Sequence, residues 1–337
     1  MKNLFVKRNL CVWKNNIKGI PFKFSLEEAS KKYLDDFGFF EKQINDTHKK
    51  SLVSSSKSKI TQLFAPYHGI SVKMTSSTQY NGYYEIDVPH TTYNFTKKQF
   101  ETTIKTYKYD IQGEIKSYYY PYGTNDLQMY AGCTYAHSYM NHLKISISEF
   151  SAVTNLQKSD FISNNTNEYI SVEPPTSSTG YTLTKLVDNL YNLEMDRALN
   201  HLQQHITATR HYIRSVNYNL SECDISFDTW FVPIYVYKYS DSDNINLYKV
   251  MNGVNEKIIG DKIRNENKLG FASFIGLSCS ALLLRTQGAS LLFGPTIAFI
   301  LTSTLIVRYI SLKMHKWISN SNNEEILNKI KENEVYQ

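Results

Sequence analysis

Three histidines in the stretch HLQQHITATRH have the residue type and spacing closest to a metal site. His201 and His205 are four residues apart, which is about one helical turn, so their imidazoles could share one metal ion. His211 is displaced from His205 by about 120° around a helix, so the three rings do not converge. His137 and His142 in YAHSYMNH are five apart and offer no better geometry. We expect solvated or packing roles for all five and predict no catalytic, cofactor-binding or metal-ligating residue.

Motifs for other chemistries are also missing from the sequence. It contains no G-x-G-x-x-G, phosphate-binding loop, H-E-x-x-H or G-x-S-x-G pattern. The sequence has four cysteines, Cys11, Cys133, Cys223 and Cys279, which lie far apart and form no C-x-x-C pair. We expect them to be buried apolar packing residues. A disulfide between Cys133 and Cys223 is the alternative. Because catalysis needs titratable or metal-binding groups brought within hydrogen-bond reach, we predict a protein that is not an enzyme, uses no cofactor and works by binding.

Composition indicates a chain rich in β-structure. The 337 residues are 42% hydrophobic, enough for one large core or two modest ones, and include 26 Tyr and 17 Phe but only 14 Gly and 8 Pro. The net charge of +6 is spread along the chain, which argues against a nucleic-acid partner. The tyrosine clusters SYYYPY and YNGYY are expected in the core and edge of a sheet, with an aromatic recognition surface as the alternative.

Periodicity and turn signals place the elements of a domain over residues 21–265. Ser25 and Glu28 form a capping box that opens a helix near 25–40, and apolar spacing predicts the longest helix over 184–216. Strands are expected in LFAPYHGISVKM, YNGYYEIDV and IKSYYYPYG. The stretch WFVPIYVYKY is apolar or aromatic on both faces and predicts a buried strand, followed by a meander through the Asn252-Gly253 turn.

Two charge-free runs predict a transmembrane hairpin over residues 266–312. They extend from Leu269 to Leu284 and from Leu291 to Val307, and flanking Lys and Arg predict that both ends face the positive-inside side. Residues 313–337 form a short amphipathic tail. The expected fold class is α+β, a β-rich soluble domain with one long helix followed by a two-helix transmembrane hairpin. A buried helical hairpin in a soluble core is the alternative.

The first 20 residues are basic and free of acids, as in an amphipathic mitochondrial targeting segment. They predict a mitochondrial inner-membrane protein with both termini in the matrix. An ordinary basic arm is the alternative. Four glycosylation sequons support an endomembrane location instead, and they begin at Asn45, Asn94, Asn164 and Asn219.

Three motifs in order resemble a poorly characterised family of bacterial and organellar membrane proteins. They are IPFKFSLEEA, LFAPYHGISVKMTSSTQYNGYYEI and FVPIYVYKYSDSDNINLYKVMNGVNEKIIGDK, with the hydrophobic hairpin behind them. The resemblance implies an architecture and no chemistry. This chain lacks the zinc ribbon common in that family, and Glu256 stands where its pattern has a second glycine.

Two classes of function follow from these expectations. The first is a non-enzymatic accessory or assembly subunit of a mitochondrial inner-membrane complex, whose partners are the lipid bilayer and other subunits. The second is an endomembrane protein with a ligand- or partner-binding domain. A membrane-bound hydrolase or metal enzyme without a known motif is a weaker alternative, and no small-molecule substrate is identified.

Fusing Met1–Ile20 to a fluorescent reporter tests the targeting prediction. We expect mitochondrial fluorescence, because basic, acid-free leaders interrupted by charge direct import there. A reticular pattern, or a glycosidase-sensitive mass shift of the full chain, would support the endomembrane alternative instead.

Overall fold

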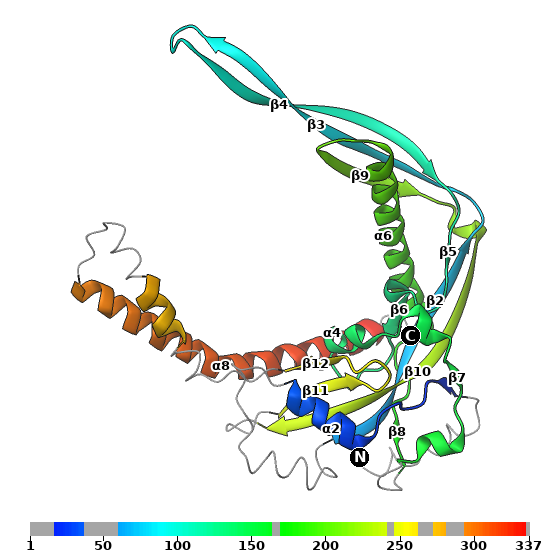
Figure 1. Ribbon diagram of the computed structural model, residues 1–337. Coiled ribbons are helices and arrows are strands. Elements are labelled where there is room, and N and C mark those ends of the chain that lie inside the picture. The colour runs from blue at the N-terminus through cyan, green and yellow to red at the C-terminus, as the bar shows by residue number, and fades with distance from the viewer. Residues whose placement is uncertain are drawn as a thin grey trace.

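A computed structural model describes residues 17–36, 60–163, 169–240, 246–261, 272–280 and 293–334 (Figure 1). Its central feature is the antiparallel pair of strands β2 (Ile60–Met74) and β10 (Cys223–Ser240). Their pairing runs without a break from Ile60 opposite Tyr237 to Met74 opposite Cys223. β-Branched and aromatic residues dominate β10, as a pleated, buried surface favours. This pair forms the middle of a nine-stranded sheet.

The other elements follow the chain around this pair. The nine-stranded sheet is completed by β1 (Lys18–Gly19), β5 (Tyr119–Tyr120), β6 (Gln128–Tyr130), β7 (Thr154–Asn155), β8 (Ser171–Val172), β11 (Asn246–Asn252) and β12 (Ile258–Gly260). A three-stranded sheet has the order β4 (Gln99–Ile115), β3 (Thr78–Asn94), β9 (Arg210–Asn217). The labelled α-helices are α2 (Leu26–Asp35), α4 (His137–Met140), α5 (Ile147–Phe150), α6 (Thr179–His205) and α8 (Phe293–Glu334), and residues 272–280 are also helical. Short 3₁₀ turns are η3 (Asn125–Leu127), η4 (Asn141–Leu143), η5 (Lys158–Phe161) and η6 (Leu220–Glu222).

The core lies on both faces of β10. Trp230, Val232, Ile234 and Val236 pack toward the segment that carries α4 and η4. On the opposite face, Tyr235 and Tyr237 pack under α2. Residues 230–237 are consequently all buried, which confirms the prediction of a buried strand from the two-sided apolar pattern.

The predicted helix near 25–40 is observed as α2, and Ser25 and Glu28 form the expected capping box. The long helix is only partly confirmed. α6 begins at Thr179 and ends at His205, and Ile206 already has extended backbone angles. The prediction of helix as far as residue 216 is wrong, because residues 210–217 form β9 and pair with β3.

The prediction of a transmembrane hairpin, with the fold class that includes it, is wrong. Within the described residues, no helix carries an apolar stretch long enough to span a bilayer. Most of the second predicted span, from Phe293 to Val307, lies in α8. Residues 272–280 of the first span are helical, and its remaining residues lie outside the described ranges.

The predicted tail is not a separate helix but the end of α8, which docks on the body through polar contacts. Glu325 accepts hydrogen bonds from the Ser138 amide at 2.6 Å and the Ser138 hydroxyl at 2.7 Å. Asn322 donates to Asp261 at 3.0 Å, and the Lys329 ammonium lies 3.7 Å from the centre of the Tyr181 ring. Figure 1 shows the other end of α8 extending away from the sheets.

Gly69 in β2 lies under the Trp230 indole, so replacement with Ala tests the packing of the central strand pair. A Cβ there would stand 2.9 Å from Trp230 Cζ3 and 3.1 Å from Leu127 O. We expect Gly69→Ala to lower the free energy of unfolding by about 1–3 kcal/mol in urea titrations, because the core must shift to admit it. Gly180→Ala is the control, since a Cβ there meets nothing within 4 Å. Equal stabilities for the two variants would contradict this packing.

Candidate functional site

The β3–β4 hairpin forms an arm that projects from the body (Figure 1). Its strands are 17 residues each and pair over their whole length, from Thr78–Ile115 to Asn94–Gln99. β9 accompanies β3 only from Gln79 to Glu85, so among the described residues the arm is two-stranded for roughly 30 Å beyond that point. Two strands alone are marginally stable in water, so the base of the arm must hold it.

A fully buried carboxylate on α6 holds the base. Glu194 accepts hydrogen bonds from the Thr78 hydroxyl at 2.6 Å, the Tyr120 hydroxyl at 2.5 Å and the Arg197 guanidinium at 2.7 Å. These donors come from β3, β5 and α6, so one side chain joins both sheets to the helix. Burial and the neighbouring Glu194 carboxylate raise the pKa of Tyr120 well above its usual range, so this hydroxyl remains a donor at neutral pH.

Apolar packing supports the same junction. Tyr80 and Ile115 of the arm, Val216 of β9 and Ala198 of α6 form a small buried cluster. Gly113 is required here, because a Cβ at that position would overlap the Tyr80 ring. The lower part of the arm therefore rests on α6 by shape as well as by hydrogen bonding.

Stacked aromatic rings continue along the middle of the arm. Tyr83 stacks on Tyr212 with ring centres 4.7 Å apart, and the Lys108 ammonium lies 3.7 Å from the Tyr83 ring centre. On the other face Tyr84 stacks on Tyr109 at 5.2 Å. Such cross-strand pairs stabilise a hairpin by about 0.2–1 kcal/mol each, so the middle of the arm is stiffened on both faces.

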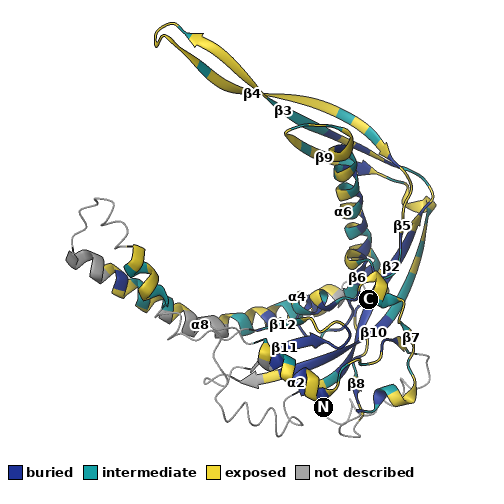
Figure 2. Cartoon of the chain, in the orientation of Figure 1, coloured by how far each residue is buried: buried dark blue, intermediate teal, exposed yellow. Residues whose placement is uncertain are grey.

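The outer half of the arm has one face without charged residues. Strand register places six residues on it, and we call these the uncharged face: Pro89, Thr91, Tyr93, Phe100, Thr102 and Ile104. Ile104 is 72% exposed and Phe100 75% exposed. Phe95, in the connecting turn, is 84% exposed and packs edge-on against Tyr93. Figure 2 shows the outer arm as mainly exposed.

The opposite face and the turn carry the charges of the outer arm. Glu101 accepts hydrogen bonds from Lys97 at 2.8 Å and Asn94 at 3.0 Å. Lys105 pairs across the strands with Val88, on the same face as Glu101. The arm is therefore amphipathic, and its uncharged face resembles the centre of a protein interface, where charged residues are depleted and aromatic residues enriched.

The histidines considered as metal ligands occupy separate environments. His201 and His205 stack at 4.2 Å, but His201 Nδ1 lies 3.2 Å from the Tyr80 hydroxyl and His205 Nδ1 lies 2.8 Å from the His201 carbonyl. His211 lies on β9, and its Nε2 is 2.8 Å from the Ile206 carbonyl. No three His, Cys, Asp or Glu side chains in the described ranges are placed to hold a metal ion.

The second histidine pair does not form a site either. Burial, and then the nearby Lys329 charge, lower the pKa of His137 to about 4, and its Nε2 lies 2.9 Å from the Gly132 carbonyl. Its ring is therefore neutral at pH 7, and His142 is exposed.

The cysteines in the described ranges do not pair. Cys133 and Cys223 are both free thiols, so the disulfide considered between them does not form. Cys279 is exposed, contrary to the expectation of a buried packing role, and Cys11 lies outside the described residues.

The tyrosine clusters divide between core and surface. Tyr80 and Tyr120 are buried, as expected for a sheet core, whereas Tyr118 and Tyr119 are exposed. The sequence reasoning did not single out Phe95, Phe100 or Ile104. Their signal is weak, because alternating apolar and polar residues around a Lys-Lys turn predict a hairpin without showing that both of its faces are uncovered.

No family model, curated protein or solved structure matches this chain. The resemblance to a membrane-protein family therefore stays a prediction, and the geometry of the arm is the basis for assigning a function.

Replacing Glu194 with Ala tests whether it holds the arm. The change leaves the Thr78 and Tyr120 hydroxyls without their acceptor and Arg197 without its buried partner charge, so we expect a loss of about 3–5 kcal/mol in unfolding free energy. Amide hydrogen exchange should also accelerate from Thr78 to Tyr84. Asp110→Ala, which removes an exposed ion pair with Arg214, is the control and should cost about 0–1 kcal/mol. Unchanged exchange in the Glu194 variant would show that the arm is held by other contacts.

Proposed function

We propose that this protein is a non-catalytic accessory or assembly factor that binds a partner protein through the outer half of the β3–β4 arm. The observation that carries this proposal is an arm anchored at its base by buried contacts while Phe95, Phe100 and Ile104 remain 72–84% exposed. Burying one large apolar side chain contributes about 1.5–3 kcal/mol, so a partner that covers these three gains several kcal/mol.

The geometry of the arm supports a protein as the partner. Aromatic side chains grouped on an uncharged surface are typical of the few residues that dominate protein–protein affinity. In the described part of the chain, the outer edge of β4 and the edge of β3 beyond Glu85 pair with no strand. Backbone groups along these edges can pair with an extended segment of a partner, while the uncharged face provides side-chain contacts.

A catalytic role for this surface has less support. The uncharged face has no carboxylate, imidazole or ammonium group. It carries one tyrosine, one phenylalanine and two threonines, and these side chains offer packing and hydrogen bonding only. The face therefore has what recognition requires and lacks the groups that acid–base chemistry needs.

The location of the protein enters this proposal through residues 1–20. Import into mitochondria remains our expectation, although residues 1–16 lie outside the described part of the chain. Anchoring by a transmembrane hairpin, and the orientation derived from it, form no part of the proposal.

The double variant Phe95→Ser/Phe100→Ser tests the proposed function. Both side chains are exposed and pack only on Tyr93, so we expect the free energy of unfolding to fall by no more than about 2 kcal/mol. We expect at least a tenfold loss of the protein that co-purifies with the tagged chain from its native cells, because aromatic anchors commonly contribute 2 kcal/mol or more to binding, which is roughly thirtyfold in affinity.

Tyr119→Ser is the matched control, since Tyr119 is 54% exposed but lies outside the arm. It should leave co-purification unchanged. Equal recovery of the same partners by the arm variant, by the control and by the wild type would refute the proposed function.

A further inference from the structure

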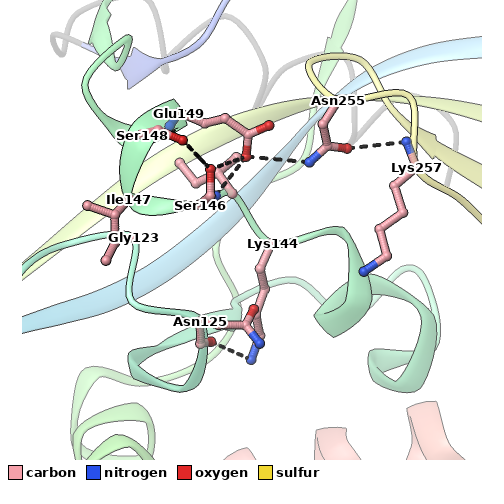
Figure 3. A pocket seen from close by; sticks show the side chains of 10 residues that line it. Gly123, Asn125, Lys144, Ser146, Ile147, Ser148, Glu149, Asn255 and Lys257 are labelled. Carbon is pink, nitrogen blue, oxygen red and sulfur yellow. Dashed lines mark hydrogen bonds between the residues drawn. The ribbon is translucent and has the colours of Figure 1, made fainter.

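The open depression shown in Figure 3 has charged walls that the chain itself engages. Its volume is about 690 Å³, and it lies between the turn before η3, the segment that leads into α5 and the turn between β11 and β12. Lys144 donates to the Asn125 carbonyl at 3.0 Å, and Glu149 accepts from the Ser146 amide at 2.7 Å. The edge of the arm differs, because the described chain leaves its backbone groups without a neighbouring strand.

The free edge of β4 runs along the whole arm. β4 pairs with β3 over all of its 17 residues, and in the described part of the chain no strand lies on its other side. Such an edge presents a row of backbone N–H and C=O groups, which is a template for another strand. Because a two-stranded ribbon is marginally stable in water, a third strand on this edge would also stabilise the arm.

Proline interrupts the outer edge of β3 but not that of β4. Pro89 has no backbone N–H, and proline occurs in sheets with its nitrogen facing away from the neighbouring strand. Pro89 lies opposite Ile104, so the backbone groups of Ile104 also face outward in the antiparallel pair. β4 contains no proline, so every outward N–H along it can donate. By the same alternation, the outward-facing residues of β4 in the outer arm are Phe100, Thr102, Ile104 and Thr106.

Two opposite charges on β4 are placed symmetrically about Thr103. Glu101 lies two residues before it and Lys105 two residues after it, on the face opposite the uncharged face. If two β4 strands pair antiparallel with Thr103 opposite Thr103, Glu101 of each copy faces Lys105 of the other. Two ion pairs then form at once, and opposite charges across antiparallel strands stabilise the pairing.

Both charged groups are able to take this new partner. Lys105 is exposed and has no ion-pair partner among the described residues. The Glu101 carboxylate accepts from Lys97 and Asn94, but a carboxylate has about four acceptor positions, so it can accept a further ammonium group.

The same register suits the uncharged face. Thr102 of each copy lies opposite Ile104 of the other, and the exposed Phe100 and Ile104 side chains of the two copies gather on one side of the joined sheet. Moving the centre by one residue in either direction places Glu101 opposite Thr103 or Tyr107, so the directly opposed ion pairs are lost. Charge therefore selects one register.

We propose that the outer arm joins two copies of this chain, which pair antiparallel along the edge of β4 with Thr103 at the two-fold centre. The contact is isologous, so it closes with two copies. Because the strands are antiparallel, the two bodies lie at opposite ends of the paired arms. The pairing uses the edge of β4 and leaves the uncharged faces open side by side, so it does not depend on the partner proposed for them.

Thr103→Cys in the full chain tests both the pairing and its register. The two Cα atoms at the centre would be about 4.5 Å apart, since Thr103 would occupy a non-hydrogen-bonded pair, and a disulfide can span this distance. We expect diamide to link this variant into covalent dimers at least about tenfold faster than Thr92→Cys. Thr92 is exposed on the same face but lies on β3, and the wild type with its native cysteines gives the background rate.

Charge variants distinguish this pairing from other modes of self-association. In sedimentation of the purified chain, Glu101→Lys and Lys105→Glu should each weaken dimerisation about tenfold or more, because like charges then face each other twice. Mixing the two variants places opposite charges at both positions, so mixed dimers should form as readily as wild-type dimers. Asp110→Lys is the matched control on the same strand, outside the paired segment, and should dimerise like the wild type.

Any one of three results overturns the proposal. They are a wild-type chain that sediments as a monomer at micromolar concentrations, a Thr103→Cys variant that forms linked dimers no faster than Thr92→Cys, and mixed charge variants that stay monomeric. All three measurements use the purified chain alone, so they are separate from the recovery of a partner protein by the arm.

Discussion

The projecting arm depends on α6, which packs on both sheets. Leu186 and Leu190, in its first half, lie against Ile70 and Val72 of the nine-stranded sheet. Its second half carries Glu194 and Ala198 to the base of the three-stranded sheet. Because two strands hold each other weakly, the direction of the arm is fixed by this helix and its buried carboxylate.

Several buried polar side chains of this protein form hydrogen bonds between segments that are distant in sequence. Glu194 joins α6 to β3 and β5, and Glu173 accepts from the Tyr130 hydroxyl and the Thr134 amide at 2.9 Å or less. Asn252 joins the β11–β12 turn to the end of η4. Burying a polar group is costly unless it is fully paired, so each of these side chains specifies one arrangement of its segments. The arm rests on one such side chain, Glu194.

The sequence predicts the parts of the fold that depend on local signals. The capping box of α2 and the burial of residues 230–237 are both visible in the residue pattern. The end of α6 is not, because Ile213 fits a helical apolar repeat and equally fits β9, and only its pairing with β3 decides between them. The charge-free runs mislead as well, because no helix among the described residues is long and apolar enough to cross a bilayer.

The candidate surfaces are harder to predict than the fold. An alternating pattern places Phe100 and Ile104 on one face of a strand, but it does not reveal that nothing in the described chain covers that face. A surface made by long-range packing carries no local signal, which explains why a search for motifs does not find it.

Site-specific photo-crosslinking from position 95 tests the central claim most directly, because it reports what touches the tip of the arm in the cell. With a benzophenone amino acid in place of Phe95, the account predicts a discrete protein adduct that is missing when the same group replaces Tyr119. Adducts formed only with lipid, or the same adducts from both positions, would contradict the claim that the arm binds a partner protein.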